Sequence, residues 1–252
     1  MEKQSIYKID QLQLLQKVGE GSFGEVFKVK KKETGEIFAA KISLTIINEE
    51  EEIDEIKDDD ATKKHNHSLI RNLVREVNIL SKLNHPCIIK FIGFSPVSFN
   101  GEKKPVIITD FFPNGTLKDL IKLEQKGLSH EKWNDTRKLI VIYGIASGML
   151  YLHSHNIMHR DLKPDNIMMD DDMYPRITDF GLSKISHSNE DSMPLNSTKG
   201  VKGTIIYLPP ESLFECEYSN AGDIYAFAMI VYEIMTNEEP FGKCNYIELM
   251  KK

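Results

Sequence analysis

The 252-residue chain has few cysteines and no long apolar run. Its three cysteines, Cys87, Cys216 and Cys244, lie far apart and form no Cys-x-x-Cys pair. An odd number of scattered cysteines is typical of free thiols in a reducing compartment rather than of disulfides or a zinc site. The two most apolar stretches, 139–152 and 224–235, are shorter than the ~20 residues that span a bilayer. We therefore expect both stretches to be buried helices.

The sequence also lacks an excess of basic charge. Lys and Arg total 32 against 38 Asp and Glu, a net charge of −6, which argues against a dedicated nucleic-acid-binding protein. Residues 1–4 contain no apolar signal core. We expect a cytoplasmic protein, with the nucleus as the alternative, that binds no nucleic acid and inserts into no membrane. The length suits one large domain or two closely packed lobes.

The apolar patterns predict strands first and helices afterwards. Period-two alternation favours strands within 12–47 and at 88–94 and 106–109. Apolar residues at 3.6-residue periodicity favour helices at 70–80, 116–126, 135–153 and 223–236. This order predicts an α+β fold of two lobes with a hinge near 110–115. The expected parts are an N-terminal extension at 1–11, a first lobe at 12–110 and a second lobe at 111–252.

An acidic run interrupts the first lobe at residues 49–60. Such a run repels itself and has little to bury, so it predicts a solvated insertion over about 48–66. A docking site for a regulatory partner is the alternative interpretation.

The most informative segment reads His-Arg-Asp-Leu-Lys-Pro-Asp-Asn at residues 159–166. Asp179-Phe180-Gly181 begins 18 positions after Asp161. Together they place two carboxylates, an amide and an ammonium near one site, which supplies the base, metal ligands and cation that phosphoryl transfer needs. An aspartate in a loop is more often a turn former or a cap, so no single residue here is diagnostic. The combination resembles the eukaryotic protein kinase catalytic domain, and Lys163 matches its serine/threonine type.

The resemblance implies a role for each residue of these motifs. Asp161 would be the catalytic base that accepts the proton of the substrate hydroxyl. Lys163 would neutralise charge on the moving γ-phosphoryl group of ATP. Asn166 and Asp179 would hold Mg²⁺, a hard cation that takes oxygen ligands.

The resemblance also implies control by a loop that follows Asp179. In the family, an arginine at the position of Arg160 receives a phosphate from this loop in a bidentate, charge-assisted pair. Ser197 and Thr198 are the candidates for phosphorylation. The alternative is that both hydroxyls are ordinary loop residues.

Gly19-x-Gly21-x-x-Gly24 is weak evidence alone, because the same spacing occurs in tight turns and in dinucleotide-binding folds. Here an alternating stretch follows, which favours a hairpin whose backbone amides approach phosphate. Lys41, 17 residues after Gly24 in an apolar strand, matches the family's phosphate-binding lysine. Glu76 matches its acidic partner on the next helix. A surface lysine and a solvated helix face are the alternatives.

Further positions resemble the adenine pocket of the family. The resemblance assigns the adenine contacts to Val18, Val26, Ala39 and Met168. Asp110 and Phe112 would offer backbone groups at the hinge, and Thr109 falls at the gatekeeper position. Each of these residues could equally be plain core.

The end of the sequence both matches the family and departs from it. Glu211 closes Pro-Pro-Glu where the family has Ala-Pro-Glu. Variants similar to the proline at 209 occur among tyrosine-kinase-like members, so the resemblance is to that group. Asp223 matches the helix aspartate that ties down the catalytic loop. The resemblance covers about 12–250 and stops inside the family's helix G. We expect a second lobe that lacks its last helices, either as a fragment of a longer product or as a natural short form.

The sequence thus predicts a protein serine/threonine kinase that uses ATP and Mg²⁺ and acts on protein substrates. A pseudokinase or nucleotide-binding scaffold with little turnover, because of the missing helices, is the alternative. A small-molecule phosphotransferase is a third interpretation. It is disfavoured by residues 203–211, which match the family's peptide-binding platform.

Overall fold

The computed structural model describes residues 6–21, 24–44, 61–185 and 203–242. The chain divides into two compact units. The first comprises Met1–Asn84 and Ile89–Phe111, and the second comprises His85–Ile88 and Phe112–Lys252. Strands dominate the first unit and helices the second, so the predicted α+β fold class is confirmed.

The first unit is built on an antiparallel sheet with the strand order β1-β2-β3-β5-β4. Its strands are β1 (Leu12–Gly21), β2 (Gly24–Lys31), β3 (Ile37–Ser43), β4 (Phe91–Ser95) and β5 (Val106–Asp110). Ala40, in the middle of β3, pairs with Phe27 of β2 and Ile108 of β5. Ala40 and Ile108 are fully buried with Val29, and they form the core of this unit.

The N-terminal segment belongs to this sheet rather than extending away from it. Ile6 forms a parallel bridge with Phe94, and the backbone N–H of Tyr7 donates to the Phe94 carbonyl at 2.7 Å. Tyr7 and Ile9 pack against the core of the sheet. A short 3-10 helix, Ile9–Gln11, then leads into β1. The segment therefore covers the outer strand, β4.

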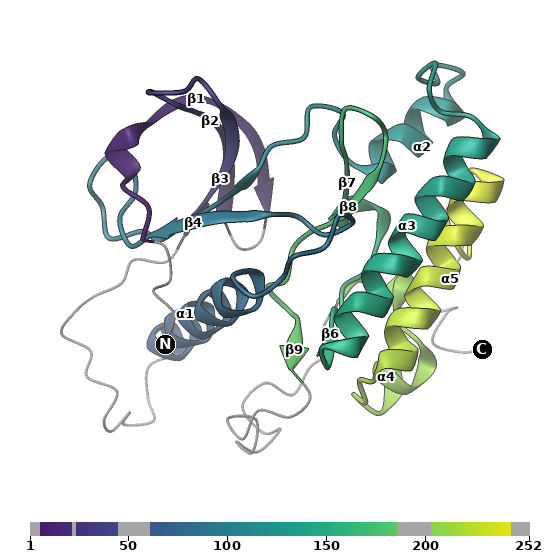
Figure 1. The fold of residues 1–252 in the computed structure, drawn as a ribbon. Helices are drawn as coiled ribbons and strands as arrows, with labels where there is room; N and C mark the ends of the chain where they lie inside the picture. Colours follow the sequence, from purple (N-terminus) through teal and green to yellow (C-terminus); the bar gives the residue numbers. More distant parts are fainter. Residues whose placement is uncertain (1–5, 22–23, 45–60, 186–202, 243–252) are drawn as a thin grey trace. The chain divides into compact units, whose positions relative to one another are not determined.

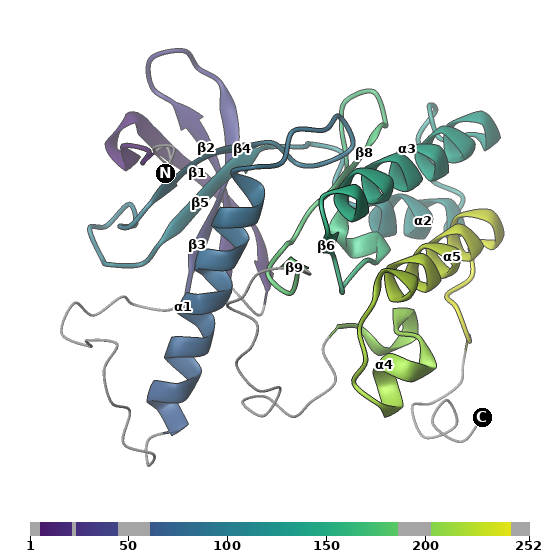
Figure 2. The ribbon, with the colours of Figure 1, turned by 60° about the horizontal axis from the view of Figure 1, so that its bottom comes forward.

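Helix α1 (Ala61–Leu80) lies alongside the sheet in both ribbon views (Figures 1 and 2). Its C-terminal half buries Val77, Ile79 and Leu80. The helix begins nine residues before the predicted start at 70. The prediction that residues 61–66 belong to the acidic insertion is therefore wrong, because these residues are helical. These residues carry no apolar periodicity, and periodicity alone therefore places the start of the helix too late. Residues 45–60 lie outside the described part of the chain.

The strand predicted at 88–94 is also corrected, because β4 begins at Phe91. Ile88 belongs to the second unit, where it forms an isolated bridge with Ile177. The Ile88 N–H donates to the His85 carbonyl at 3.0 Å, and the Ile177 N–H donates to the Cys87 carbonyl at 2.9 Å. The Ile88 N–H is therefore used in a turn, and it is not available to the ladder of a longer β4.

The second unit contains four helices in the part that the structure describes. They are α2 (Leu117–Gln125), α3 (Asp135–Ser154), α4 (Pro210–Phe214) and α5 (Asn220–Thr236). Short strands pair in two antiparallel ribbons: β6 (Ile157–Met158) with β9 (Lys184–Ile185), and β7 (Ile167–Met169) with β8 (Pro175–Ile177). Short 3-10 helices cover Pro164–Asn166 and Ile205–Tyr207.

Side-chain caps mark the starts of α2 and α3. Thr116 and Asp119 form a reciprocal capping box at the start of α2, and Asn134 accepts the Arg137 N–H at the start of α3. Helix α5 ends where Asn237 adopts the left-handed conformation, at φ 58°.

Helices α3 and α5 contain the two most apolar stretches, and they lie side by side (Figure 1). The prediction that they are buried is only half right. Ile145 and Ile230 are completely buried, whereas Tyr143, Leu150 and Met235 are exposed. Among the described residues, no helix is both long and apolar enough to cross a membrane.

Candidate active site

In the first unit, Lys41 of β3 meets Glu76 of α1. Lys41 Nζ lies 2.8 Å from Glu76 Oε1 and 3.1 Å from Oε2, so the ammonium contacts both carboxylate oxygens. Because side chains alternate along a strand, the buried Ala40 places Lys41 on the opposite face of β3. The Glu76 side chain is only 7% exposed, and the ion pair compensates for the burial of its charge. The pairing expected from the sequence is therefore present in the structure.

The glycine motif forms a hairpin between β1 and β2, with Gly21 paired to Gly24. A Cβ atom on Gly24 would stand 2.2 Å from the backbone oxygen of Ile42 in β3, so only glycine fits there. A Cβ on Gly19 would meet its nearest neighbour, Val26 Cβ, at an ordinary 3.8 Å. The absence of a side chain at Gly24 therefore allows β3 to lie close to the hairpin. At Gly19 the absence of a side chain leaves the backbone open, as phosphate binding requires.

The residues assigned to adenine are distributed over both units. In the first unit Val18 is exposed, and Val26 and Ala39 are half-buried, so they offer apolar surface on β1, β2 and β3. Thr109 and Asp110 end β5 and are half-buried. Met168 in β7 and Phe112 belong to the second unit, and both are half-buried there.

In the second unit, Asp161 is the centre of a compact hydrogen-bond network. Its Oδ1 accepts from the backbone N–H and from the hydroxyl of Thr204, both at 2.9 Å. Its Oδ2 lies 2.8 Å from Lys163 Nζ and 3.1 Å from Asn166 Nδ2. Lys163 Nζ also donates to the Thr204 hydroxyl at 2.8 Å. A carboxylate, an ammonium and a hydroxyl are thus held in one fixed arrangement.

Asn166 and Asp179, the expected metal ligands, fit the needs of Mg²⁺. Asn166 donates its Nδ2 hydrogens to the backbone oxygen and the side chain of Asp161, which leaves Oδ1 as its ligand atom. Thr178 donates its N–H to the Asn166 carbonyl at 2.9 Å, which fixes the residue directly before Asp179. No three His, Cys, Asp or Glu side chains converge among the described residues. Two oxygen ligands supplemented by phosphate oxygens are the usual environment of this ion.

Asp223 of α5 holds the backbone that precedes Asp161. Its Oδ2 accepts the His159 N–H and its Oδ1 accepts the Arg160 N–H, both at 2.8 Å, while His153 Nε2 lies 2.9 Å from Oδ2. Burial alone would raise the pKa of the Asp223 carboxyl. The His153 hydrogen bond, the electrostatic interaction with His159 and the two backbone N–H groups outweigh burial and hold the pKa below its ordinary value.

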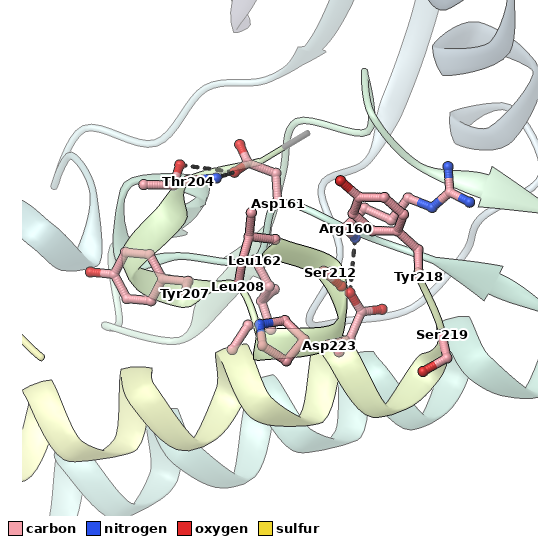
Figure 3. Close-up of a pocket in the computed structure, with 13 residues that line it drawn as sticks. Arg160, Asp161, Leu162, Thr204, Tyr207, Leu208, Ser212, Tyr218, Ser219 and Asp223 are labelled. Atoms are coloured by element: carbon pink, nitrogen blue, oxygen red, sulfur yellow. Dashed lines mark hydrogen bonds between the residues drawn. The ribbon is translucent and has the colours of Figure 1, made fainter. Parts of the chain in front are cut away.

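A small pocket lies beside Asp161, between the backbone of residues 204–209 and the start of α5 (Figure 3). The dashed lines in Figure 3 join Thr204 to Asp161 and Arg160 to Asp223. Arg160 adopts the left-handed region at φ 67°, and its guanidinium lies 5.1 Å from the centre of the Tyr218 ring. The backbone around the base is therefore held from α5 and from the segment before it.

Comparison with known proteins decides the family. The family model described as the protein kinase domain matches residues 12–252. This chain belongs to the protein kinase family. The resemblance inferred from the motifs, and the two-lobed protein-kinase fold class, are therefore confirmed. Membership of the tyrosine-kinase-like group and an end inside helix G remain predictions.

Curated relatives of this kinase domain include several named serine/threonine kinases. Aurora kinase of Saccharomyces cerevisiae is 35% identical over 92% of this chain and 55% of its own length. Serine/threonine-protein kinase AtPK1/AtPK6 of Arabidopsis thaliana is 32% identical over 92% of this chain and 43% of its own length. Serine/threonine-protein kinase 36 of Pongo abelii is 30% identical over 96% of this chain and 16% of its own length. The chain thus spans about half or less of the length of these relatives.

The remaining residues assigned from the sequence are Ser197, Thr198 and Glu211. Ser197 and Thr198 lie outside the described residues. Within the described part of the kinase domain, no ion pair joins the Glu211 side chain to a cation. Burial is the larger cause of a raised pKa of Tyr225, and the charge of Glu211 is the second cause.

Sequence reasoning missed the contacts of Thr204 and His153. Thr204 lies in the segment 203–211 that matches the family's peptide-binding platform, but nothing in the sequence indicates that it contacts Asp161, 43 positions away. His153 is one of 8 histidines, and only the packing of α3 on α5 singles it out.

Proposed function

We propose that this kinase domain transfers the γ-phosphoryl group of Mg²⁺-ATP to serine and threonine hydroxyls of proteins. The observation that carries the proposal is the arrangement of Asp161, Lys163 and Thr204, in which a carboxylate and an ammonium lie 2.8 Å apart and share one hydroxyl partner. Phosphoryl transfer needs a base for the acceptor and a cation for the charge that develops on the phosphoryl group.

The residues divide the chemical work as follows. The acceptor hydroxyl oxygen forms a bond to the γ-phosphorus, the bond from that phosphorus to the β-phosphate oxygen breaks, and ADP leaves. Asp161 takes the proton of the acceptor hydroxyl, and Lys163 neutralises charge on the moving group. Lys41, oriented by Glu76, contacts the α- and β-phosphates. Asn166 and Asp179 would hold Mg²⁺, which when bound would neutralise phosphate charge.

A non-catalytic scaffold is not favoured over an enzyme. Such a scaffold would not need the base, the phosphate-binding lysine and both metal ligands together, and this chain retains all four, as Asp161, Lys41, Asn166 and Asp179. Preference for serine and threonine is supported by Lys163, and the relatives named serine/threonine kinases agree with it.

The test is transfer of labelled phosphate from ATP by the purified chain to a mixture of Ser, Thr and Tyr peptides. Asp161→Asn, which keeps the shape of the side chain but loses its basicity, should abolish transfer. Asp171→Asn, a change at an exposed position, should leave transfer intact. Label on Ser and Thr peptides that disappears only in Asp161→Asn would establish the activity. A folded wild-type chain without transfer would refute it.

A further inference from the structure

Glu233 of α5 is a completely buried carboxylate to which the proposed chemistry assigns no part. Its Oε1 lies 2.5 Å from Lys118 Nζ, and its Oε2 accepts the Tyr207 hydroxyl at 2.7 Å. A buried charge persists only where partners compensate its desolvation. Both oxygens are matched here, one by a cation and one by a neutral donor.

The two partners come from elements far apart in the sequence. Lys118 lies in the first turn of α2, and its Nζ also contacts Glu239 at 3.2 Å, just beyond α5. Burial lowers the pKa of Lys118, but the hydrogen bonds and charges of Glu233 and Glu239 outweigh it and raise this pKa. Burial and Glu233 raise the pKa of Tyr207, so its hydroxyl remains a donor. The Lys118 ammonium is thus charged and the Tyr207 phenol neutral at physiological pH.

Tyr207 connects this buried pair to Asp161 through one turn of backbone. The Tyr207 N–H donates to the Thr204 carbonyl at 2.9 Å and closes the 3-10 turn. The N–H and hydroxyl of Thr204 both bind Asp161 Oδ1. In Figure 3, Thr204 and Tyr207 lie on the same segment, with the Thr204 side chain turned toward Asp161. A shift of Tyr207 would therefore move the hydroxyl that Asp161 and Lys163 share.

We propose that Lys118 is a positioning residue for the phosphoryl acceptor. With Glu233 it fixes Tyr207, and through Tyr207 it fixes Thr204 against the base. The proposal rests on the proposed kinase activity and deepens it. It concerns transfer to the acceptor rather than binding of ATP, because Thr204 contacts the proposed base Asp161 and Lys163, whereas the α- and β-phosphates of ATP are assigned to Lys41.

The experiment measures steady-state kinetics of the full chain with Lys118→Met. We expect kcat/KM for a Ser/Thr peptide to fall about tenfold, because the buried carboxylate loses its cation, and KM for ATP to stay within about twofold. Lys118→Arg, which retains the cation, should recover most of the loss. Lys122→Met, on an exposed part of the same helix, is the matched control and should behave as wild type.

Tyr207→Phe removes only the hydroxyl and tests the same path if Lys118→Met folds poorly. A merely structural role would lower the melting temperature and depress hydrolysis of ATP without peptide as much as peptide phosphorylation. That equal loss, or kinetics of Lys118→Met that match Lys122→Met, would overturn the proposal. If the wild type transfers phosphate, the proposed function stands whether or not Lys118 is a positioning residue. A wild type that transfers no phosphate would refute both the proposed function and the role of Lys118.

Discussion

Oδ1 of Asp223 accepts the backbone N–H of Arg160 at 2.8 Å. A residue of α5 thereby holds the peptide unit that joins His159 to Arg160, one residue before Asp161. Arg160 has φ 67°, a conformation that residues other than glycine seldom adopt, so the hydrogen bond offsets a local conformational cost. The position of the base thus depends on a carboxylate that contacts no reacting group.

Asp223→Asn should therefore lower both stability and turnover. Asp223 is 3% exposed and accepts three hydrogen bonds, and an amide cannot accept them all. We expect the free energy of unfolding to fall by about 2 kcal/mol. Urea denaturation would measure it, with Asp172→Asn, at an exposed position, as the control. Equal stability of the two variants would contradict the prediction.

The same carboxyl predicts a pH dependence. Because the folded-state pKa of Asp223 is lower than the value of 3.8 expected in the unfolded chain, the ionised form stabilises the folded state. This contribution is complete above about pH 3.8 and is lost as the pH falls through the lower folded-state pKa. The stability difference between wild type and Asp223→Asn should thus be constant from pH 7 to 5 and shrink below about pH 4. A difference that grows on acidification would show the opposite shift.

Lys41→Met should remove the proposed phosphate contact without unfolding the chain. Turnover should fall about 10²–10³-fold, as when one charge-stabilising group is lost. Glu76→Gln keeps the lysine but weakens its orientation, so we expect mainly a higher KM for ATP. Steady-state kinetics at varied ATP would separate the two effects. Lys82→Met, at an exposed position after α1, should leave both parameters unchanged.

The two outer glycines of the hairpin should respond differently to alanine. Gly24→Ala brings a Cβ to 2.2 Å from the Ile42 carbonyl oxygen and must displace β3, at a cost of about 1–3 kcal/mol. Gly19→Ala meets nothing closer than 3.8 Å and should fold as the wild type does. Thermal unfolding of both variants would check the contrast. A Gly19→Ala variant as unstable as Gly24→Ala would show that the clash is not the cause.

Those features of the structure that depend on local sequence patterns could be predicted from the sequence. Alternation predicted the strand that bears Lys41, and this strand is present as β3. The spacing of motifs predicted roles for Asp161, Asn166 and Asp179, and the structure places Asn166 against Asp161. Such predictions depend only on residues within a few positions of one another or on a family pattern. The prediction of where α1 begins was wrong, because the first turns of this helix, from Ala61, lack an apolar face in the sequence.

Contacts between distant elements could not be read from the sequence. Lys118 and Glu233 are separated by 115 positions, and both occur in helices where a solvated charge is the ordinary expectation. Their burial is decided by how α2 and α5 pack, which no periodicity encodes. The same holds for His153 and Asp223, 70 positions apart.

The bridge between Ile6 and Phe94 has a consequence for solubility. β4 is an outer strand of its sheet, and an unpaired strand offers its peptide groups to any chain that can dock in extended form. The segment before β1 occupies part of that edge and packs the partly buried Tyr7 against the core. A variant trimmed to begin at Leu12 would present the bare edge, and self-association at high concentration would be its first symptom, ahead of any loss of catalysis.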